Sequence, residues 1–267
     1  MTSVNEVYRL IQSKAPFQIQ MDFDNSGFLV GRGERLVNRI LVALDITDPV
    51  IEEAINCGAQ LIVAHHPVIW GGIKSVTDQS VTGRKILLMA EHGIAAICAH
   101  TNLDAVEDGV NDALALKLGL ADIGQLHQDG VDDQGRPYGI GRIGTVPAQS
   151  LYDFALSVKQ LLGSNGIRLV DGGNPVHTVA VGGGSCSNMV RDVIAQGCDT
   201  FVTSDVKYDG FLDAKALGIN LIDAGHYPTE NVVCPVLQSW LQEAFPEVDI
   251  IISKCHSFFT CNIISFH

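Results

Sequence analysis

The 267-residue chain contains no apolar run that approaches the roughly 20 residues needed to span a membrane. Basic residues are also few, with 17 Lys and Arg against 30 Asp and Glu, so the net charge is −13. Proteins that bind nucleic acid through its phosphates need clustered Lys and Arg side chains. The composition therefore argues against membrane and nucleic acid partners. The first 14 residues also lack the basic and apolar segments of a signal peptide, so we expect a cytoplasmic protein.

Cysteine pairs with the spacing of a metal or redox site are missing as well. None of the seven cysteines forms a CxxC motif, and they are scattered at Cys57, Cys98, Cys186, Cys198, Cys234, Cys255 and Cys261. An odd number in mostly apolar surroundings predicts reduced, buried thiols rather than a disulfide framework or a zinc ribbon. The chain also has no GxSxG motif, and its glycine-rich stretch at 182–185 matches neither GxGxxG nor a P-loop. The chemistry must therefore be sought in other side chains.

The sequence does contain a regular alternation of short apolar runs with amphipathic segments. Ser3 to Lys14 is the first amphipathic helix, and Ser3 with Glu6 fits a capping box. Asp48 and Pro49 fit the cap and the first position of the next helix. We expect further helices at 80–91, 109–118, 150–162, 188–195, 211–217 and 229–245, and strands at 39–46, 60–64, 94–99, 138–146, 167–170, 177–181, 200–203, 219–223, 248–252 and 257–264. This alternation predicts an α/β protein with mostly parallel sheets.

Two polar stretches interrupt the alternation. Asp22 to Gly33 is predicted to be a loop, with Asn25-Ser26-Gly27 as its turn. Leu120 to Pro137 is polar and contains several glycines, so it is the best candidate for a domain boundary.

A glycine at a predicted helix end is followed seven or eight residues later by a polar side chain on four occasions. The pairs are Gly58 with His65, Gly93 with His100, Gly197 with Asp205, and Gly218 with His226. Each polar side chain then follows a strand, at the carboxyl edge where open α/β sheets bind their ligands. Repeated helix–strand units alone would explain the glycines, but not the histidines at three of the four ends.

His65 and His66 are the first candidates for a metal site. They follow the apolar run 61–64 directly, and Pro67 ends the run. A neutral imidazole is a good ligand near pH 7, and a strand end holds it on a rigid scaffold. Because neighbouring strand residues point to opposite faces, the two histidines could each bind one of two close metal ions. The alternative is a pair of hydrogen-bonded loop histidines.

Two further segments offer carboxylates. Asp104 could reach the same edge as a ligand, or could be a turn or cap residue of the helix that begins near Gly109. His100 could be a ligand or could orient one. His226 and Glu230 are four residues apart at a predicted helix start and face the same way, unless Glu230 simply caps that helix.

These candidates form one set of nitrogen and carboxylate ligands: His65, His66, Asp104, His226 and Glu230. A set without thiolate suits Zn, Fe, Mn or Ni, and a bridging carboxylate is compatible with two metal ions about 3.5–4 Å apart. Asp45 and Asp205 end other strands and are candidates for orienting or substrate-binding roles, or are ordinary turn residues. Residues 182–185 (Gly-Gly-Gly-Ser) could bind an anion or form a tight strand-to-helix turn.

Five motifs carry a resemblance to a known family. They are Asp24-Asn25-Ser26-Gly27, Ala64-His65-His66-Pro67, His100-Thr101-Asn102-Leu103-Asp104, Gly183-Gly184-Ser185 and Gly225-His226-Tyr227-Pro228-Thr229-Glu230. In this order, over nearly the whole chain, they resemble the Nif-three-like dinuclear metal centre proteins. Bacterial members of that family are widely labelled GTP cyclohydrolase 1 type 2 homologues.

The resemblance implies two α/β domains with the metal site in the cleft between them. The first would comprise residues 1–125 and be completed by residues 226–267, and the second would comprise residues 126–225. The resemblance also implies a toroidal homohexamer and metal ligands at His65, His66, Asp104, His226 and Glu230. Relatives commonly have glycine where Ser204 stands and histidine where Asp209 stands, so a substrate role of this loop does not carry over.

Two functions fit these features. The first is a metal-dependent hydrolase of GTP cyclohydrolase type that acts on a nucleotide-like substrate. There, two divalent metal ions would lower the pKa of bound water towards about 7, and His100 or Glu230 would move the proton. The second is a non-catalytic protein that uses the same ligands for metal storage, delivery or sensing. A nucleic-acid-binding regulator is disfavoured by the charge.

Overall fold

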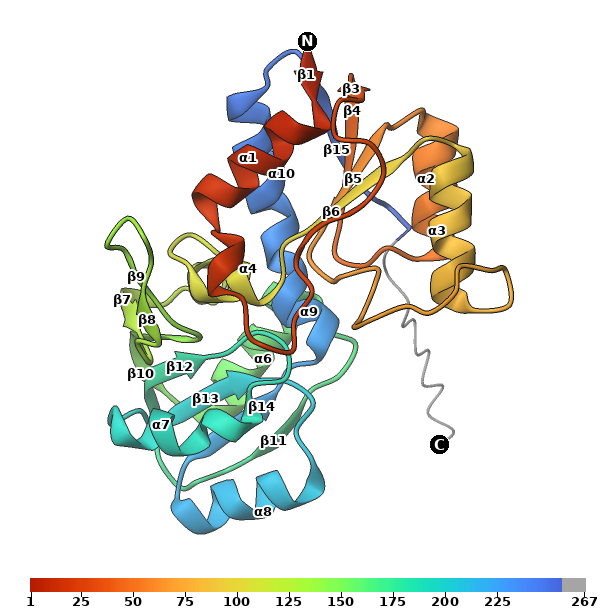
Figure 1. Cartoon of the computed structure of the whole chain (residues 1–267). Helices are drawn as coiled ribbons and strands as arrows, with labels where there is room; N and C mark the ends of the chain where they lie inside the picture. The colour runs from red at the N-terminus through yellow and green to blue at the C-terminus, as the bar shows by residue number, and fades with distance from the viewer. Residues whose placement is uncertain (256–267) are drawn as a thin grey trace. The chain divides into compact units, whose positions relative to one another are not determined.

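The computed structural model describes residues 1–255, which form two compact units (Figure 1). Unit 1 contains Met1–Val110, Asp129–Gly139 and the described residues from Val233 onward, and unit 2 contains Asn111–Gln128 and Ile140–Val232. The predicted strand at 257–264 lies outside the described residues. Both units combine helices with a sheet, so the predicted α/β class with two α/β domains is confirmed.

Unit 1 is built on a five-stranded sheet with the order β15-β4-β5-β6-β2. Its first four strands, β15 (Asp249–Ile252), β4 (Arg39–Ala43), β5 (Leu61–Ala64) and β6 (Ala95–Cys98), run parallel. β2 (Gly27–Val30) adds an antiparallel edge strand. The remaining elements are β1 (Thr2–Ser3), α1 (Val4–Lys14), η1 (Phe17–Ile19), β3 (Leu36–Val37), α2 (Asp48–Cys57), α3 (Val81–Glu91), α4 (Thr101–Ala105), β8 (Gly130–Val131), β9 (Pro137–Tyr138) and α10 (Cys234–Ala244).

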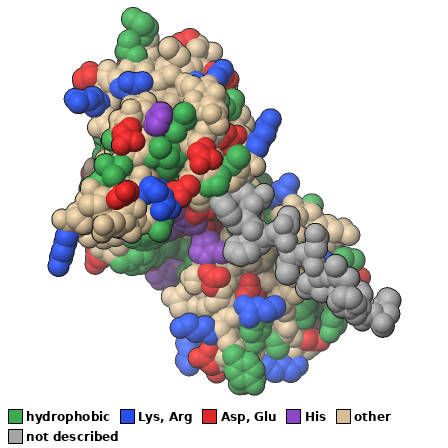
Figure 2. Space-filling view, turned by 90° about the vertical axis from the view of Figure 1, so that its right-hand side faces the viewer, with side chains coloured by type: hydrophobic (Ala, Val, Ile, Leu, Met, Phe, Trp, Pro, Cys, Tyr) green, Lys and Arg blue, Asp and Glu red, His purple; other side chains and the backbone are tan. Residues whose placement is uncertain are grey.

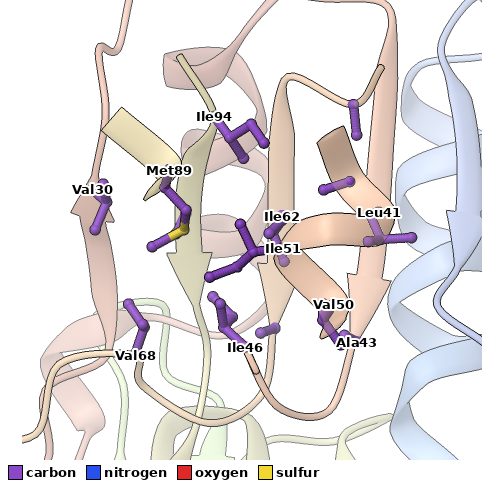
Figure 3. Packing of buried hydrophobic residues seen from close by; sticks show 14 of the residues in the cluster. Val30, Leu41, Ala43, Ile46, Val50, Ile51, Ile62, Val68, Met89 and Ile94 are labelled. Atoms are coloured by element: carbon purple, nitrogen blue, oxygen red, sulfur yellow. The ribbon is translucent and has the colours of Figure 1, made fainter. Parts of the chain in front are cut away.

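The core of unit 1 lies between the sheet and helices α2 and α3. Alternate residues of the parallel strands, such as Leu41 and Ile62, meet Ile51 of α2 and Met89 of α3 in this layer (Figure 3). All four side chains are fully buried. Strands buried on both faces need apolar residues at every position, which explains the unbroken apolar runs in the sequence.

Unit 2 is built on a six-stranded sheet with the order β11-β14-β13-β12-β10-β7. The strands β12 (Val176–Val181), β13 (Thr200–Thr203) and β14 (Asn220–Asp223) run parallel. The antiparallel strands β11 (Arg168–Val170), β10 (Arg142–Gln149) and β7 (Ala121–Gln125) extend the sheet. The remaining elements are α5 (Val110–Lys117), α6 (Leu151–Leu162), η2 (Ser187–Met189), α7 (Val190–Ala195), α8 (Tyr208–Leu217), α9 (His226–Glu230) and η3 (Asn231–Val233).

The ends of two helices test the predicted caps. The capping box of α1 is confirmed, because the Ser3 hydroxyl accepts from the Glu6 amide and the Glu6 carboxylate accepts from the Ser3 amide. The predicted Asp48 cap of α2 is wrong by one residue: Thr47 is the cap, and its hydroxyl accepts from the Val50 amide. Asp48 instead lies in the first turn, where the helix dipole favours a negative charge.

The structure differs from several predicted segments; the strand predicted at 138–146, for example, is β10 at Arg142–Gln149. The predicted loop Asp22 to Gly33 contains strand β2, because its apolar residues pair with β6. The polar stretch 120–137 contains β7, which pairs with β10, and the short hairpin strand β8. The single helix predicted at 229–245 is divided into α9, η3 and α10, and a proline lies at the start of α10, where its missing amide hydrogen breaks no helical bond.

The two compact units differ at their edges from the domain limits expected from the sequence. Residues 111–128 belong to unit 2, because Leu114 and Leu118 pack in its core with Val146 of β10. Residues 129–139, the β8–β9 hairpin, belong to unit 1, where Arg136 donates to the Ser13 carbonyl. Helix α9 belongs to unit 2.

Within residues 1–255, no helix is both long enough and apolar enough to cross a membrane. Nor does a disulfide join any of the six cysteines that the structure describes. Burial raises the pKa of the Cys98 and Cys234 thiols to about 12, so both stay protonated at neutral pH.

Candidate metal centre

The carboxyl ends of the parallel strands in unit 1 gather three histidines. Ala64 at the end of β5 pairs with Cys98 at the end of β6, so the residues after both strands emerge at one edge. The backbone amide of His65 donates to Ala43, 3.3 Å away, and this bond extends the ladder past the strand end. His65 and His66 follow β5, and His100 follows β6. The predicted position at the strand ends is therefore confirmed for these residues.

Each of the three histidine rings has its Nδ1 atom beside an oxygen. The Nδ1 of His65 is 2.9 Å from the Ala99 carbonyl oxygen. The His66 Nδ1 is 2.7 Å from the Asp45 carboxylate, and the His100 Nδ1 is 2.9 Å from the Asp24 carboxylate. Because carbonyl and carboxylate oxygens accept hydrogen bonds, Nδ1 carries the proton, and Nε2 carries the lone pair of the neutral ring. Metal-binding histidines are oriented in the same way.

The three rings lie close enough to hold one cation. One ring nitrogen from each of His65, His66 and His100 lies within 4.8 Å of the others. Asp104, on the short helix α4, adds a carboxylate oxygen 3.6 Å from the His65 Nε2 atom. The backbone amide of Asp104 donates to the His100 carbonyl, so the turn that follows β6 fixes its position. Unit 1 therefore gathers three imidazoles and one carboxylate.

Asp24 holds this cluster from the loop before β2, and sequence reasoning gave it no role of its own. Its carboxylate accepts hydrogen bonds from the Thr101 hydroxyl at 2.6 Å and the Ser26 hydroxyl at 2.8 Å, besides its contact with His100. Burial would raise the pKa of Asp24, but the hydrogen bonds from His100, Thr101 and Ser26 lower it well below its ordinary value. The carboxylate is therefore charged at neutral pH and fixes the His100 ring.

Unit 2 places a second imidazole–carboxylate pair after β14. Gly225 has a φ of 91° and starts the five-residue helix α9, so His226 and Glu230 lie one turn apart. The His226 Nε2 atom is 2.9 Å from the Glu230 carboxylate. The predicted arrangement of these two side chains on one helical face is confirmed. Two ligand atoms this close can bind one cation, because zinc–ligand bonds are about 2.0–2.2 Å long.

Asp205 orients the His226 ring from the end of β13. Its carboxylate is 2.6 Å from the His226 Nδ1 atom, so it has the orienting position that the sequence suggested as one alternative. Burial lowers the pKa of His226, but the hydrogen bonds and charges of Glu230 and Asp205 outweigh burial and raise it to about 9. A cation bound at Nε2 would therefore have to displace a proton held there at neutral pH.

The glycine loop after β12 lies against Glu230. A Cβ atom on Gly184 would lie 2.0 Å from the Glu230 Oε1 atom, and Gly184 has a φ of 64°. The amides of Gly183 and Gly184 donate to the side chains of Asn111 and Thr229. Since these amides have side-chain acceptors, the loop is the tight turn that we considered, and it packs against the candidate ligand.

Residues 204–209 lead from β13 into the first turn of α8. Ser204 is buried, and its amide donates to the Gly184 carbonyl. Asp205 faces His226, and Asp209 lies in the first turn of α8. The loop therefore supports the second imidazole–carboxylate pair.

The residues of each unit fit a divalent metal ion. Unit 1 supplies His65, His66, His100 and Asp104, and unit 2 supplies His226 and Glu230. All are nitrogen or oxygen donors, which suits Zn, Fe, Mn or Ni. The groups of histidine and carboxylate side chains can therefore hold metal ions. The meeting of both groups in one dinuclear centre stays a prediction.

Comparison with known proteins gives a consistent result. A family model described as Duf34/NIF3 (NGG1p interacting factor 3) matches residues 2–257. The chain is 32% identical over 254 residues to a Clostridium perfringens protein named GTP cyclohydrolase 1 type 2 homolog, covering 94% of this chain and 96% of that protein. The crystal structure of a Bacillus cereus protein related to NIF3 matches with a TM-score of 0.89 and 26% identity over 97% of this chain and 99% of that one. A Staphylococcus aureus hypothetical protein matches with a TM-score of 0.88 and 28% identity over 99% of both chains.

Proposed function

The chain belongs to the Duf34/NIF3 family, and on this basis we propose that it binds two divalent metal ions in one dinuclear centre. The proposed ligands are His65, His66 and Asp104 from unit 1 and His226 and Glu230 from unit 2. We further propose a metal-dependent hydrolase of GTP cyclohydrolase type that acts on a nucleotide-like substrate, as the names of the curated relatives suggest.

One observation supports this proposal above the others. The rings of His65, His66 and His100 each have Nδ1 beside an oxygen acceptor, and one nitrogen from each lies within 4.8 Å of the others. Three histidines that merely fill a loop have no reason to bring one ring nitrogen each to one point. Fixing each ring before a metal arrives is the usual arrangement of a metal site.

The proposed chemistry assigns different tasks to the residues. A bound divalent metal ion lowers the pKa of coordinated water towards about 7 and polarises substrate oxygen atoms. His100 would accept or return a proton at Nε2, because Asp24 holds Nδ1. Glu230 would act both as a ligand and as a second proton acceptor. Asp45 and Asp205 would keep His66 and His226 in the tautomer that binds through Nε2.

The alternative is a non-catalytic protein for metal storage, delivery or sensing. The same ligands would serve it, but such a protein needs exchangeable metal rather than a position for substrate. The two functions separate on one measurement, the release of formate from GTP by the metal-loaded protein. Release that is lost in Asp104→Ala supports the hydrolase. No release, and no phosphatase or amidohydrolase activity that depends on Asp104, favours metal handling.

Metal content tests the proposed centre directly. We expect two ions of Zn, Fe, Mn or Ni per purified chain by elemental analysis. His66→Ala in unit 1 and Glu230→Ala in unit 2 should each reduce that content. His92→Ala and His177→Ala are matched controls, because each of these rings bonds a backbone carbonyl elsewhere in its unit. Loss of both ions in either variant supports one shared centre, whereas loss of a single ion indicates separate sites. Full metal content in both variants would refute the ligand assignment.

The proposal includes a toroidal homohexamer in the cytoplasm. Sedimentation or light scattering of the full chain should give six times the 28.6 kDa mass of one chain. A reducing compartment suits the six described cysteines, which form no disulfide among themselves. Nucleic acid is not among the proposed partners, and blue Lys and Arg side chains stand among red acidic ones on the face drawn in Figure 2.

A further inference from the structure

Trp70 lies beside the histidine cluster, and it is neither a proposed metal ligand nor a proposed proton carrier. It lies in the long connection between β5 and α3, four residues after His66. Its side chain is 53% exposed, whereas the second tryptophan of the chain, Trp240, is 8% exposed. Single exposed apolar residues are ordinary, so exposure alone gives Trp70 no function.

The position of the Trp70 indole beside the histidine cluster is what indicates a functional role. The Trp70 and His100 rings have centroids 5.1 Å apart and meet edge to face at 86°. His100 is itself 5.1 Å from His65 and 5.4 Å from His66 by ring centroids. An exposed indole therefore borders the three imidazoles, all within unit 1.

The connection that carries Trp70 is tied to the same support as His100. The Asn25 side-chain amide donates to the carbonyl of Ile69, the residue before Trp70, at 2.8 Å. The neighbouring Asp24 carboxylate holds the His100 Nδ1 atom. One loop thus fixes the backbone beside the indole and the imidazole next to it. A fixed backbone beside the indole reduces the conformational freedom that is lost when a ligand stacks on the ring.

We propose that the Trp70 indole is the stacking surface for the purine base of the substrate. The inference rests on the proposed function and specifies its substrate class as a purine nucleotide. Aromatic rings stack with centroids about 4.5–7 Å apart, so a base on the indole lies within about 12 Å of the His100 ring and near the candidate ligands of unit 1. Stacking reads the flat face of a base and tolerates different ring substituents. The indole therefore selects for a planar heterocycle, and other contacts must distinguish one purine from another.

Two ligands that differ only by the base test this inference. GMP carries the guanine base, whereas ribose 5-phosphate has the same sugar and phosphate without it. In a Trp240→Phe background, Trp70 is the only tryptophan of the chain, so its fluorescence reports on the indole directly. We expect GMP to quench this fluorescence in the metal-loaded protein and ribose 5-phosphate to leave it unchanged.

Affinities measured by calorimetry give the second readout. Trp70→Ala should weaken GMP binding about 10-fold, within the roughly 5- to 150-fold range that corresponds to base stacking. It should leave ribose 5-phosphate binding and metal content unchanged, and Trp70→Phe should stay within about 3-fold of the wild type. Tyr152→Ala is the matched control, since Tyr152 is an aromatic residue of unit 2 with 68% exposure.

Several outcomes would overturn the inference. They are equal binding of GMP and ribose 5-phosphate to the wild type, no GMP binding at millimolar concentration, and unchanged GMP affinity in Trp70→Ala. A variant that loses its oligomeric state but keeps its GMP affinity would identify Trp70 as a subunit contact instead. The proposed hydrolase is tested separately, because formate release from GTP is not needed for any of these results. Base-dependent GMP binding without formate release would retain the stacking role and reject the hydrolase.

Discussion

Replacing Gly184 by alanine tests whether the position of the Glu230 carboxylate matters for metal binding. The added Cβ atom would lie 2.0 Å from Glu230 Oε1, 2.9 Å from its Cδ, and 3.3 Å from His226 Nε2. Ordinary contact between heavy atoms needs about 3.5 Å. The carboxylate must therefore move by more than about 1 Å, or the loop after β12 must move by a similar distance. The loop is held by the hydrogen bond from the Gly184 amide to Thr229, so the carboxylate is the easier group to displace.

The expected effect on metal affinity is large compared with the effect on folding. Disturbing the groups that orient a metal ligand typically weakens binding about 10- to 100-fold, and we expect Gly184→Ala to fall in this range. The left-handed backbone at Gly184 adds a separate cost of about 1–2 kcal/mol in stability, because alanine has a Cβ atom. The two effects must be separated before the result is interpreted.

Gly197→Ala is the matched control for backbone strain. Gly197 has a φ of 75°, close to the 64° of Gly184, and a Cβ atom there meets nothing within 4 Å. We expect Gly184→Ala to lose at least as much unfolding free energy in urea as Gly197→Ala, but only Gly184→Ala to lose metal affinity in a competition titration with a chelator. Wild-type metal affinity in a folded Gly184→Ala variant would refute the assignment of Glu230 as a ligand held against this loop.

Three further predictions concern charge, orientation and packing. Burial opposes the ionisation of Glu53, but hydrogen bonds from Ser253 and the backbone amide of Lys254 lower its pKa below the ordinary value of 4.5. The charged Glu53 carboxylate therefore stabilises the fold fully at neutral pH, and this stabilisation is lost as the pH falls through the lowered pKa. The difference in unfolding free energy between wild type and Glu53→Gln, measured in urea, should shrink in acid. Asp24→Asn keeps the shape of the side chain but removes the charge beside His100, and it should lower formate release about 10-fold with metal content retained; an unchanged rate would contradict the orienting role. Ile62→Ala should destabilise the protein by about 2–5 kcal/mol in urea, because the side chain is fully buried in the core of unit 1.

Features that depend on neighbouring residues were predictable from the sequence. The apolar run 61–64 ends in His65 and His66, and the structure has strand β5 over those four residues. His226 and Glu230 are one helical turn apart, and their side chains meet because helix geometry requires it. In both places the residues concerned lie within five positions of one another, so the sequence alone determines which side chains share a strand end or a helical face.

Features that depend on distant segments were not predictable in this way. Asp24 contacts His100 across 76 residues, and neither residue lies in a periodic pattern that points to the other. The close approach of Gly184 to Glu230 joins a strand-to-helix turn to a separate helix, and only the packed unit reveals it. Trp70 lies in a long connection whose sequence specifies no helix or strand. Such contacts follow from how the sheet orders its strands, which local propensity does not encode.

The two units use the same local device to hold a histidine. In unit 1, Asp45 follows β4 and contacts His66 after the parallel neighbour β5, with 2.7 Å between carboxylate and Nδ1 and a separation of 21 residues. In unit 2, Asp205 follows β13 and contacts His226 after the parallel neighbour β14, at 2.6 Å and again across 21 residues. One helix and one strand fill each interval, so the length of a single helix–strand unit sets the pairing. A parallel sheet brings the residues after adjacent strands to one edge, and an aspartate there fixes the tautomer of the next histidine. In unit 2 both partners of this pairing, Asp205 and His226, also belong to the repeated glycine-to-polar spacing in the sequence. In unit 1 that spacing marks His65 and His100 instead, whose Nδ1 atoms face the Ala99 carbonyl and the Asp24 carboxylate.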